Sequence, residues 1–230
     1  MPSYVFHFGA IVENLDRFLA GAWVTIHLSL TAMLIGLALA IVCALTRSYG
    51  PRWGRWIVAT YVEVIRNTPL LVQLFVIFFG LPDLGVRITP YQAALLGIVI
   101  NLGAYATEIV RAGIEAVPRG QIEAGRSLGL TRIQVLRLIV LMPAIETVYP
   151  ALASQFVLVM LGSSIVSMIA VEDLSAVATS VQSETFRAFE VYAAIGVIYL
   201  ALALAFRMLL GSVDRVLFES RRQGRGRPQR

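Results

Sequence analysis

The chain has 230 residues, of which 58% are hydrophobic and only 14% charged. A soluble domain of this length rarely has that balance, because its surface has to be wetted, so we expect a membrane protein. The formal net charge of +5 would point to a nucleic-acid partner in a soluble protein. Here we expect no nucleic-acid partner and instead arginines at the cytoplasmic surface of the lipid.

All nineteen basic residues are arginine. Because a P-loop needs a lysine to hold the phosphates, the chain cannot be a conventional nucleotide hydrolase by itself. No pairing of a nucleophile with a base is visible, so we expect no catalytic residues. The single Cys43 lies in an apolar run and is expected to pack there. His7 and His27 without a cysteine cluster predict no metal site.

Five apolar runs are long enough to span a membrane, since crossing about 30 Å of hydrocarbon takes about 20 helical residues. They lie near residues 20–45, 57–80, 91–112, 148–170 and 190–211. Backbone polar groups must be satisfied inside lipid, so these runs should be helices. We expect an all-α integral membrane protein whose residues 1–230 form one transmembrane domain. The segment before the first run has no basic stretch typical of a cleavable signal.

The arginines predict the orientation of these spans. One side carries Arg47, Arg52 and Arg55 after the first run, Arg111, Arg119, Arg126, Arg132 and Arg137 around the loop after the third, and Arg215 with the cluster from Arg221 onward after the fifth. The other side carries only Arg17, Arg87 and Arg187, among several acidic residues. The asymmetry places the N-terminus outside and the basic tail 212–230 in the cytoplasm, which requires an odd number of spans.

The cytoplasmic loop 113–147 is too long to be a simple connection. Pro118 suits a first helical position and Gly129 suits the residue just past a helix end, so a short helix is predicted from about 118 to 128.

A second helix in this loop is predicted to follow the first. Thr131 with Gln134 has the spacing of a capping box, which would open the helix. We expect this second helix to end near Pro143.

The first loop helix has the features of a segment that plugs into a cleft of a protein partner. Ile122 and Leu128 offer an apolar patch, surrounded by Arg119, Glu123 and Arg126. The small residues Gly120, Ala124 and Gly125 would allow close approach, and Gly129 permits a left-handed turn. The alternative is an amphipathic helix that lies on lipid.

The loop resembles the EAA loop of ABC importer permeases, through which a permease receives force from an ATPase subunit. Its pattern is Glu123-Ala124-Gly125, three residues, Gly129, nine residues, and then Ile139, Leu141 and Pro143. The family usually has alanine where this chain has Gly125. The end of the pattern is also one residue longer than usual, because Met142 separates Leu141 from Pro143.

From about residue 18 to 218 the chain resembles the polar amino-acid branch of these permeases. The segments that carry the resemblance are Arg66-Asn67-Thr68-Pro69-Leu70 with the residues to Phe75, Phe79-Gly80-Leu81-Pro82, Asn101 to Ile114, Val117 to Gln121, and Phe189-Glu190-Val191-Tyr192. Many relatives carry a Lys-Asp-Thr-Ser-Leu-like stretch in span four. This chain reads Leu161-Gly162-Ser163-Ser164-Ile165 there, which removes the basis for recognition of a charged side chain by this subunit.

Polar residues inside the spans are candidates for a substrate path, because such groups are unfavourable at membrane depth and are often functional. The candidates are Asn101, Tyr105, Glu108, Gln155, Ser163 and Ser164. For Asn101, Gln155 and the two serines, the alternative is hydrogen bonding between helices. For Glu108, the alternative is an ion pair with Arg111, three residues on.

The resemblance implies a permease subunit of the type I ABC importer kind, with five spans, N-out and C-in, and a cytoplasmic coupling helix. It implies ABC ATPase subunits, which bind ATP and Mg²⁺, a second permease subunit, and an extracytoplasmic solute-binding protein. The substrate would be a polar amino acid or a related solute, imported across the bacterial inner membrane. An ion-coupled secondary transporter and a non-transporting scaffold or channel are the alternatives. The sequence leaves open whether the permease pair is homodimeric or heterodimeric.

Overall fold

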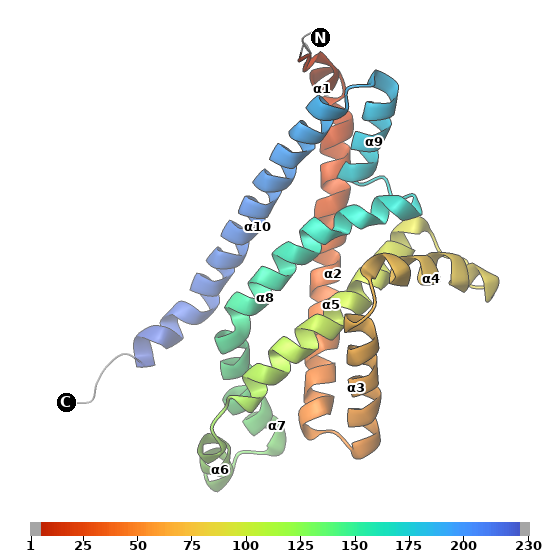
Figure 1. The fold of residues 1–230 in the computed structure, drawn as a ribbon. Coiled ribbons are helices and arrows are strands. Elements are labelled where there is room, and N and C mark those ends of the chain that lie inside the picture. Colours follow the sequence, from red (N-terminus) through yellow and green to blue (C-terminus); the bar gives the residue numbers. More distant parts are fainter. Residues whose placement is uncertain (1–5, 226–230) are drawn as a thin grey trace. The chain divides into compact units, whose positions relative to one another are not determined.

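The computed structural model describes the backbone of residues 6–225 and the side chains of residues 6–216. Every regular element in this range is a helix, which confirms the all-α prediction (Figure 1). The elements are α1 (Gly9–Glu13), α2 (Leu15–Tyr49), α3 (Arg52–Arg66), α4 (Leu70–Asp83), α5 (Pro90–Glu115), α6 (Arg119–Ser127), α7 (Arg132–Gln134), η1 (Val135–Leu141, a π-helix), α8 (Met142–Gly162), η2 (Ser163–Ile169, a 3₁₀-helix), α9 (Leu174–Thr185) and α10 (Ala188–Arg225).

Four helical stretches of the described chain are long and apolar enough to cross a membrane, and α3 with α4 gives a fifth if the two form one bent span. The four are Leu15–Tyr49, Pro90–Glu115, Arg132–Ile169 and Ala188–Val216. They contain or closely match four of the five predicted runs. Because α10 continues to Arg225, most of the predicted basic tail is helical, while the last five residues lie outside the described range.

The predicted run at 57–80 is not one continuous helix. It is broken between Arg66 and Leu70, where the chain bends sharply. Pro69 is extended, with φ −63° and ψ 139°, and proline disfavours a helical conformation in the residue before it. Asn67 closes the end of α3, since its backbone and side-chain N–H groups both donate to the carbonyl of Glu63 (3.2 and 2.7 Å).

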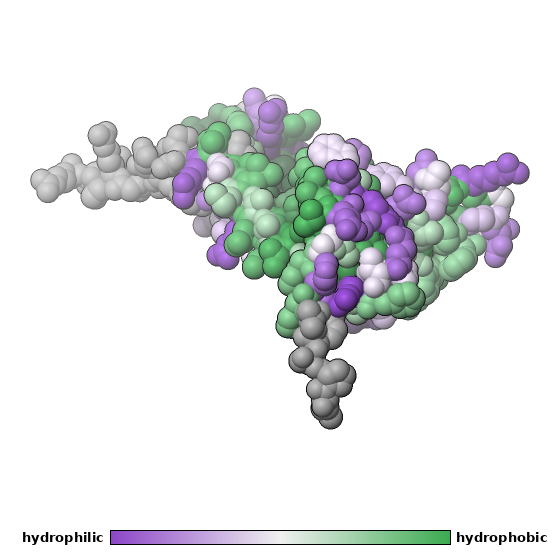
Figure 2. Space-filling model, turned by 90° about the horizontal axis from the view of Figure 1, so that it is seen from above, coloured by the Kyte–Doolittle hydropathy of each residue, from purple (hydrophilic) through white to green (hydrophobic). Residues whose placement is uncertain are grey.

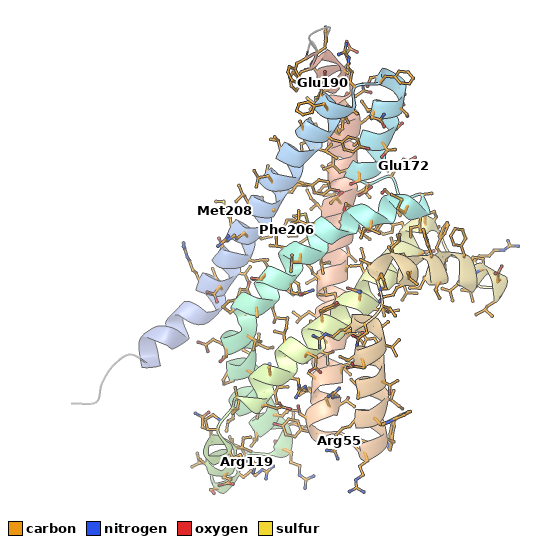
Figure 3. All side chains as sticks on the ribbon, in the orientation of Figure 1. Arg55, Arg119, Glu172, Glu190, Phe206 and Met208 are labelled. Atoms are coloured by element: carbon orange, nitrogen blue, oxygen red, sulfur yellow. The ribbon has the colours of Figure 1, made fainter. Side chains whose placement is uncertain are left out.

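The surface of the helices is strongly apolar, as expected of a protein that faces lipid. On α10, Phe206 is buried, whereas Met208, two residues on, is 73% exposed (Figure 3). Leu200 and Leu204 of the same helix are also exposed. Hydrophobic residues cover much of the face seen in Figure 2. This exposed apolar surface supports α10 as a membrane span.

The chain divides into two compact units. The α9 unit comprises residues 1–35, 68–100 and 157–205, and the α6 unit comprises residues 36–67, 101–156 and 206–230. Helices α2, α5, α8 and α10 contribute a segment to each.

The α9 unit packs α9 against the first half of α2. Its core contains Phe18, Ala22, Leu174, Ala178, Val181, Val191 and Ile195. A Cβ on Gly21 would lie 3.0 Å from the carbonyl oxygen of Asp173 and from the Cα of Leu174, so glycine permits this close approach. Buried Thr25 accepts a hydrogen bond from the N–H of Leu174 (3.3 Å).

The apolar runs do not predict α9, which lies between the last two predicted spans. Asp173 caps its start by accepting from the N–H of Ala176 (2.9 Å), and burial raises the pKa of the Asp173 carboxyl to about 6. Near its end, Arg17 pairs with Glu184 at 2.8 Å. Hydrogen bonds from Arg17 and then Ser180 lower the pKa of Glu184 to about 2.

The entry to α10 is tied to the N-terminal segment of the same unit. Glu190 is fully buried, and its carboxylate accepts a hydrogen bond from the N–H of His7 (3.1 Å; Figure 3).

His27 contacts the hydroxyl of Tyr91 at 2.6 Å. His7 thus contacts Glu190 through its backbone, and His27 contacts Tyr91 through its ring.

The α6 unit depends on glycines that let helices approach closely. A Cβ on Gly103 of α5 would lie 2.7 Å from the Cδ2 of Leu39 and from the hydroxyl of Tyr61. A Cβ on Gly113 would lie 2.8 Å from the carbonyl oxygen of Ala144 in α8. Segments of α2, α3, α5 and α8 are thus packed against one another within this unit.

We expect the two ends of the spans to label from opposite sides of the membrane. In a Cys43→Ser background, Arg126→Cys should react with an impermeant maleimide only in inside-out vesicles, and Asp83→Cys only in right-side-out vesicles. The arginine asymmetry is the physical reason. The Cys43→Ser protein alone should not react. Labelling of both positions from one side would contradict the five-span topology.

Candidate functional site

Helix α6 begins and ends one residue inside the predicted bounds, because Pro118 caps the helix instead of taking its first position. Pro118 is extended and precedes the first helical residue, Arg119. Gly129 has φ +77°, which confirms the left-handed turn past the helix end. The N–H of Leu130 donates to the carbonyl of Gly125 (3.2 Å) and that of Gly129 to Arg126 (3.0 Å), which is the Schellman arrangement that closes a helix.

The predicted capping box is also present. The N–H of Gln134 donates to the hydroxyl of Thr131 (3.3 Å), and the N–H of Thr131 donates to the side chain of Gln134 (2.9 Å). The prediction that this second helix ends near Pro143 is wrong. The helical path continues through α7, η1 and α8, and Pro143 is the second residue of α8.

The π-helix η1 explains how the chain passes Pro143. Proline has no N–H to donate, and its ring collides with the carbonyl four residues earlier in a regular α-helix. A π-turn bonds residues five apart and so takes up one extra residue. The loop pattern is one residue longer than usual, at Met142, and η1 ends at Leu141 directly before it. The extra residue is therefore absorbed by a wider turn.

Gly125 packs against the chain itself. It is the buried residue of α6, and an added Cβ would collide with the Cδ1 of Ile139 in η1 and lie 3.5 Å from Val135. We expected Ala124 and Gly125 both to leave room for a partner. Only Ala124 is exposed, so Gly125 instead seats α6 on η1.

The rest of the predicted coupling surface is exposed. Its residues are Arg119, Gly120, Glu123, Ala124, Leu128 and Gly129. Leu128 is 82% exposed, although it is a large apolar residue outside the predicted spans. Arg119 stands at the first position of α6 (Figure 3). This face combines small, charged and apolar residues on one short helix.

Glu108 lies in a cluster of charges in the α6 unit. Its carboxylate is 2.7 Å from Arg111, which confirms the ion pair that was the alternative to a free path residue. Arg111 also contacts Glu115 at 2.6 Å, and Arg47 of α2 lies 3.8 Å from Glu108. The sequence analysis used Arg47 only to predict the orientation of the spans. It did not predict the contact with Glu108, because the two residues are 61 positions apart.

The other candidates for the path on α5 and α8 are half-buried. The hydroxyl of Tyr105 donates to the carbonyl of Arg66 (3.3 Å), and the guanidinium of Arg66 lies 5.4 Å from the centre of the Tyr105 ring. Asn101 and Gln155 belong to the same unit as Tyr105 and Glu108.

The two serines belong to the α9 unit and sit at the start of η2. Ser163 is buried and donates to the carbonyl of Met160 (2.7 Å), so its hydroxyl bonds the backbone of its own helix. The carbonyl of Ser164 accepts from the hydroxyl of Ser167 (2.8 Å). The structure thus groups four of the six candidates in one unit and leaves the serines in the other.

Comparison with known families identifies residues 36–218 as matching the family described as "Binding-protein-dependent transport system inner membrane component". A probable glutamine ABC transporter permease, GlnM of Bacillus subtilis, is 34% identical over 91% of this chain and 97% of that protein. The L-cystine transport system permease TcyB of the same species is 40% identical over 67% of this chain and 66% of that protein. The arginine transport permease ArtQ, also from B. subtilis, is 32% identical over 91% of this chain and 96% of that protein.

Solved structures agree with these relatives. A chain of an amino acid ABC transporter crystallised with histidines has a TM-score of 0.83 and 38% identity, covering 93% of this chain and all of that one. A chain of the MetNI methionine ABC transporter in an inward-facing conformation has a TM-score of 0.73 at 19% identity, covering 89% and 98%, which shows a shared fold.

The packing of Gly125 predicts a contrast between two glycines of one helix. Gly125→Leu should lower stability by about 1–3 kcal/mol, because the larger side chain overpacks the contact with Ile139. Gly120→Leu should be nearly neutral, since nothing lies within 4 Å of a Cβ at Gly120. Gly125→Ala should also be tolerated, because only the mobile end of Ile139 has to move. Thermal unfolding of the purified protein in detergent measures all three, and equal losses for both leucine variants would contradict the packing.

Proposed function

The chain belongs to the family of binding-protein-dependent transport system inner membrane components and is a multi-pass permease of the bacterial inner membrane, and on this premise we propose that it serves an ATP-driven importer of a polar amino acid or a related small solute. Permeases of this family are typically non-catalytic. The relatives support the substrate class, since their names specify glutamine, cystine and arginine.

The exposed face of α6 is the observation that carries the proposal. A helix that lies on lipid needs a broad apolar face. Among the nine residues of α6 the only large apolar side chain is Ile122, which is half-buried. Exposed Leu128 stands just past the helix beside Glu123 and Ala124. One apolar anchor among small and charged residues suits a cleft in a protein better than a bilayer.

ATP hydrolysis in this proposal belongs to separate subunits. The chain has no lysine to form a P-loop, so ATP and Mg²⁺ would bind to ABC ATPase subunits that dock on α6. Two permease subunits, identical or homologous, would flank one path, and a solute-binding protein would deliver the solute from outside. Because Gly125 seats α6 on η1 and η1 continues into α8, movement of α6 would be passed directly to α8.

The substrate path in this proposal follows the polar residues of α5. Asn101 and Glu108 are seven residues apart, about two helical turns, and so lie on nearly one face. The span-four stretch at Ser163 carries no charged side chain, so selection by side-chain charge would come from the partner permease or the binding protein. This subunit would then contact the α-amino and α-carboxylate groups that amino acids share.

Transport assays in proteoliposomes test the function. The chain, co-expressed with its ATPase and partner permease, should take up labelled glutamine, cystine or arginine only when ATP is on the ATPase side and binding protein is outside. Uptake that follows an ion gradient without ATP would instead indicate a secondary transporter. A stable complex that moves none of these amino acids under either condition would indicate a scaffold or channel.

Charge reversal on α6 should uncouple the complex. Glu123→Arg places the wrong charge on the docking face, and Gly129→Val puts a branched side chain at φ +77°, a conformation that such residues rarely adopt. Both should insert normally, retain less ATPase on purification and lose at least tenfold in uptake. Gln121→Arg is the matched control, two positions away on the opposite side of the helix. Wild-type uptake by either variant would rule out that residue in coupling.

Removing polar groups from the path should slow uptake more than ATP hydrolysis. Asn101→Leu removes a polar amide from the proposed path, and Glu108→Gln removes the charge of the carboxylate that pairs with Arg111, so both make the proposed path less polar. We expect about tenfold slower uptake with ATPase activity changed less than twofold. Glu115→Gln is the control, since it removes the more exposed partner of Arg111 and should leave uptake unchanged. Unchanged uptake in both path variants would show that these residues only pack.

A further inference from the structure

A cavity of about 570 Å³ lies beside α6, within the α6 unit. Its apolar walls include Ile122 of α6 with Val135 and Leu136 of η1. Such walls favour an apolar occupant, because they would otherwise be in contact with water. Ile122 and Arg126 of the predicted docking helix line this cavity, whereas the exposed coupling residues named above and the polar residues of α5 do not.

The polar lining of the cavity consists of Arg126, Arg132 and Tyr49. No acidic side chain is among the lining residues. Within the described part of the chain, neither arginine pairs with a carboxylate. Two guanidinium groups over apolar walls form a site for a molecule that is anionic at one end and apolar at the other. Arginine is well suited to phosphate, whose oxygens it can bind in pairs.

The cavity lies next to residues that mark the membrane interface. Tyr49 is the last residue of α2, and α3 starts three residues later with exposed Trp53 and Trp56. Tryptophan gathers at the level of the lipid headgroups. Arg55 lies between them on the same short helix (Figure 3). Helix α2 has 35 residues, roughly 52 Å, so it extends beyond the hydrocarbon core of about 30 Å.

We propose that this cavity binds the phosphate of an anionic phospholipid such as phosphatidylglycerol. Arg126 and Arg132 would contact the phosphate oxygens, while Ile122, Val135 and Leu136 would contact the glycerol and the start of an acyl chain. A free phosphate shares the charge but leaves the apolar walls unused. Basic pockets among membrane helices on the cytoplasmic side bind anionic headgroups in this way. The site does not depend on the proposed transport function.

Native mass spectrometry of the full-length chain in detergent, titrated with phosphatidylglycerol or phosphatidylcholine, tests the site. Arg126→Gln with Arg132→Gln should weaken binding of the first phosphatidylglycerol about thirtyfold, roughly fivefold for each arginine. Arg126→Lys with Arg132→Lys should recover most of it. Arg137→Gln with Arg215→Gln removes the same charge from exposed positions outside the cavity and should change it less than twofold.

A variant that fills the cavity tests whether lipid binding depends on the cavity itself, without removing either arginine. Leu136→Trp keeps both arginines and should also weaken phosphatidylglycerol binding at least tenfold. An equal loss of phosphatidylglycerol binding in the Arg137 and Arg215 control would show that binding depends on general surface charge, and would overturn the proposal. Binding of glycerol phosphate as tight as that of the lipid would also overturn it, in favour of a soluble anion. Unchanged lipid binding with loss of ATPase co-purification would assign the arginines to a protein contact instead.

Discussion

The requirement that backbone hydrogen bonds be satisfied inside hydrocarbon determines the helical architecture of this chain. It explains why the regular elements of the described residues are helices. The same need to satisfy polar groups leads many serine and threonine hydroxyls in the spans to bond a carbonyl one turn earlier. Thr107 donates to the carbonyl of Gly103 at 2.6 Å, and Ser163 donates to that of Met160. Where the helix does break, after α3, the hydroxyl of Tyr105 donates to the carbonyl of Arg66, the last residue of that helix.

Glycine determines how closely these helices approach. Lipid tails are as apolar as leucine, so the helices associate through close packing rather than through exclusion of water. Gly103 and Gly113 bring α5 against its neighbours, and Gly125 brings α6 against η1. Gly125 therefore lies at a contact inside the chain, next to the end of the Ile139 side chain. A docking surface that faces a partner does not require it, because Gly125 is buried.

Local signals in the sequence predict the elements that local chemistry decides. The apolar runs locate the long helices, Gly129 marks the end of α6, and Thr131 marks the start of α7. The sequence does not predict α9, because its apolar residues pack on α2 from a distance of more than 140 positions. It also does not predict η1, since a π-turn arises from the conflict between an inserted residue and Pro143 rather than from composition. The Arg47–Glu108 contact is not predicted either, because the two residues are also far apart in the sequence.

The contacts of the α6 unit form a continuous route from α6 to the charged cluster around Glu108. Gly125 of α6 packs on Ile139 of η1, and η1 continues into α8, where the backbone at Ala144 meets Gly113 of α5. Gly113 is five residues from Glu108, on the same helix that carries its ion pair. Every link is a direct contact or a continuous helix within one unit. Packed helices shift as bodies rather than deform, so under the proposed function this is the route by which a displacement of α6 would reach the residues around Glu108.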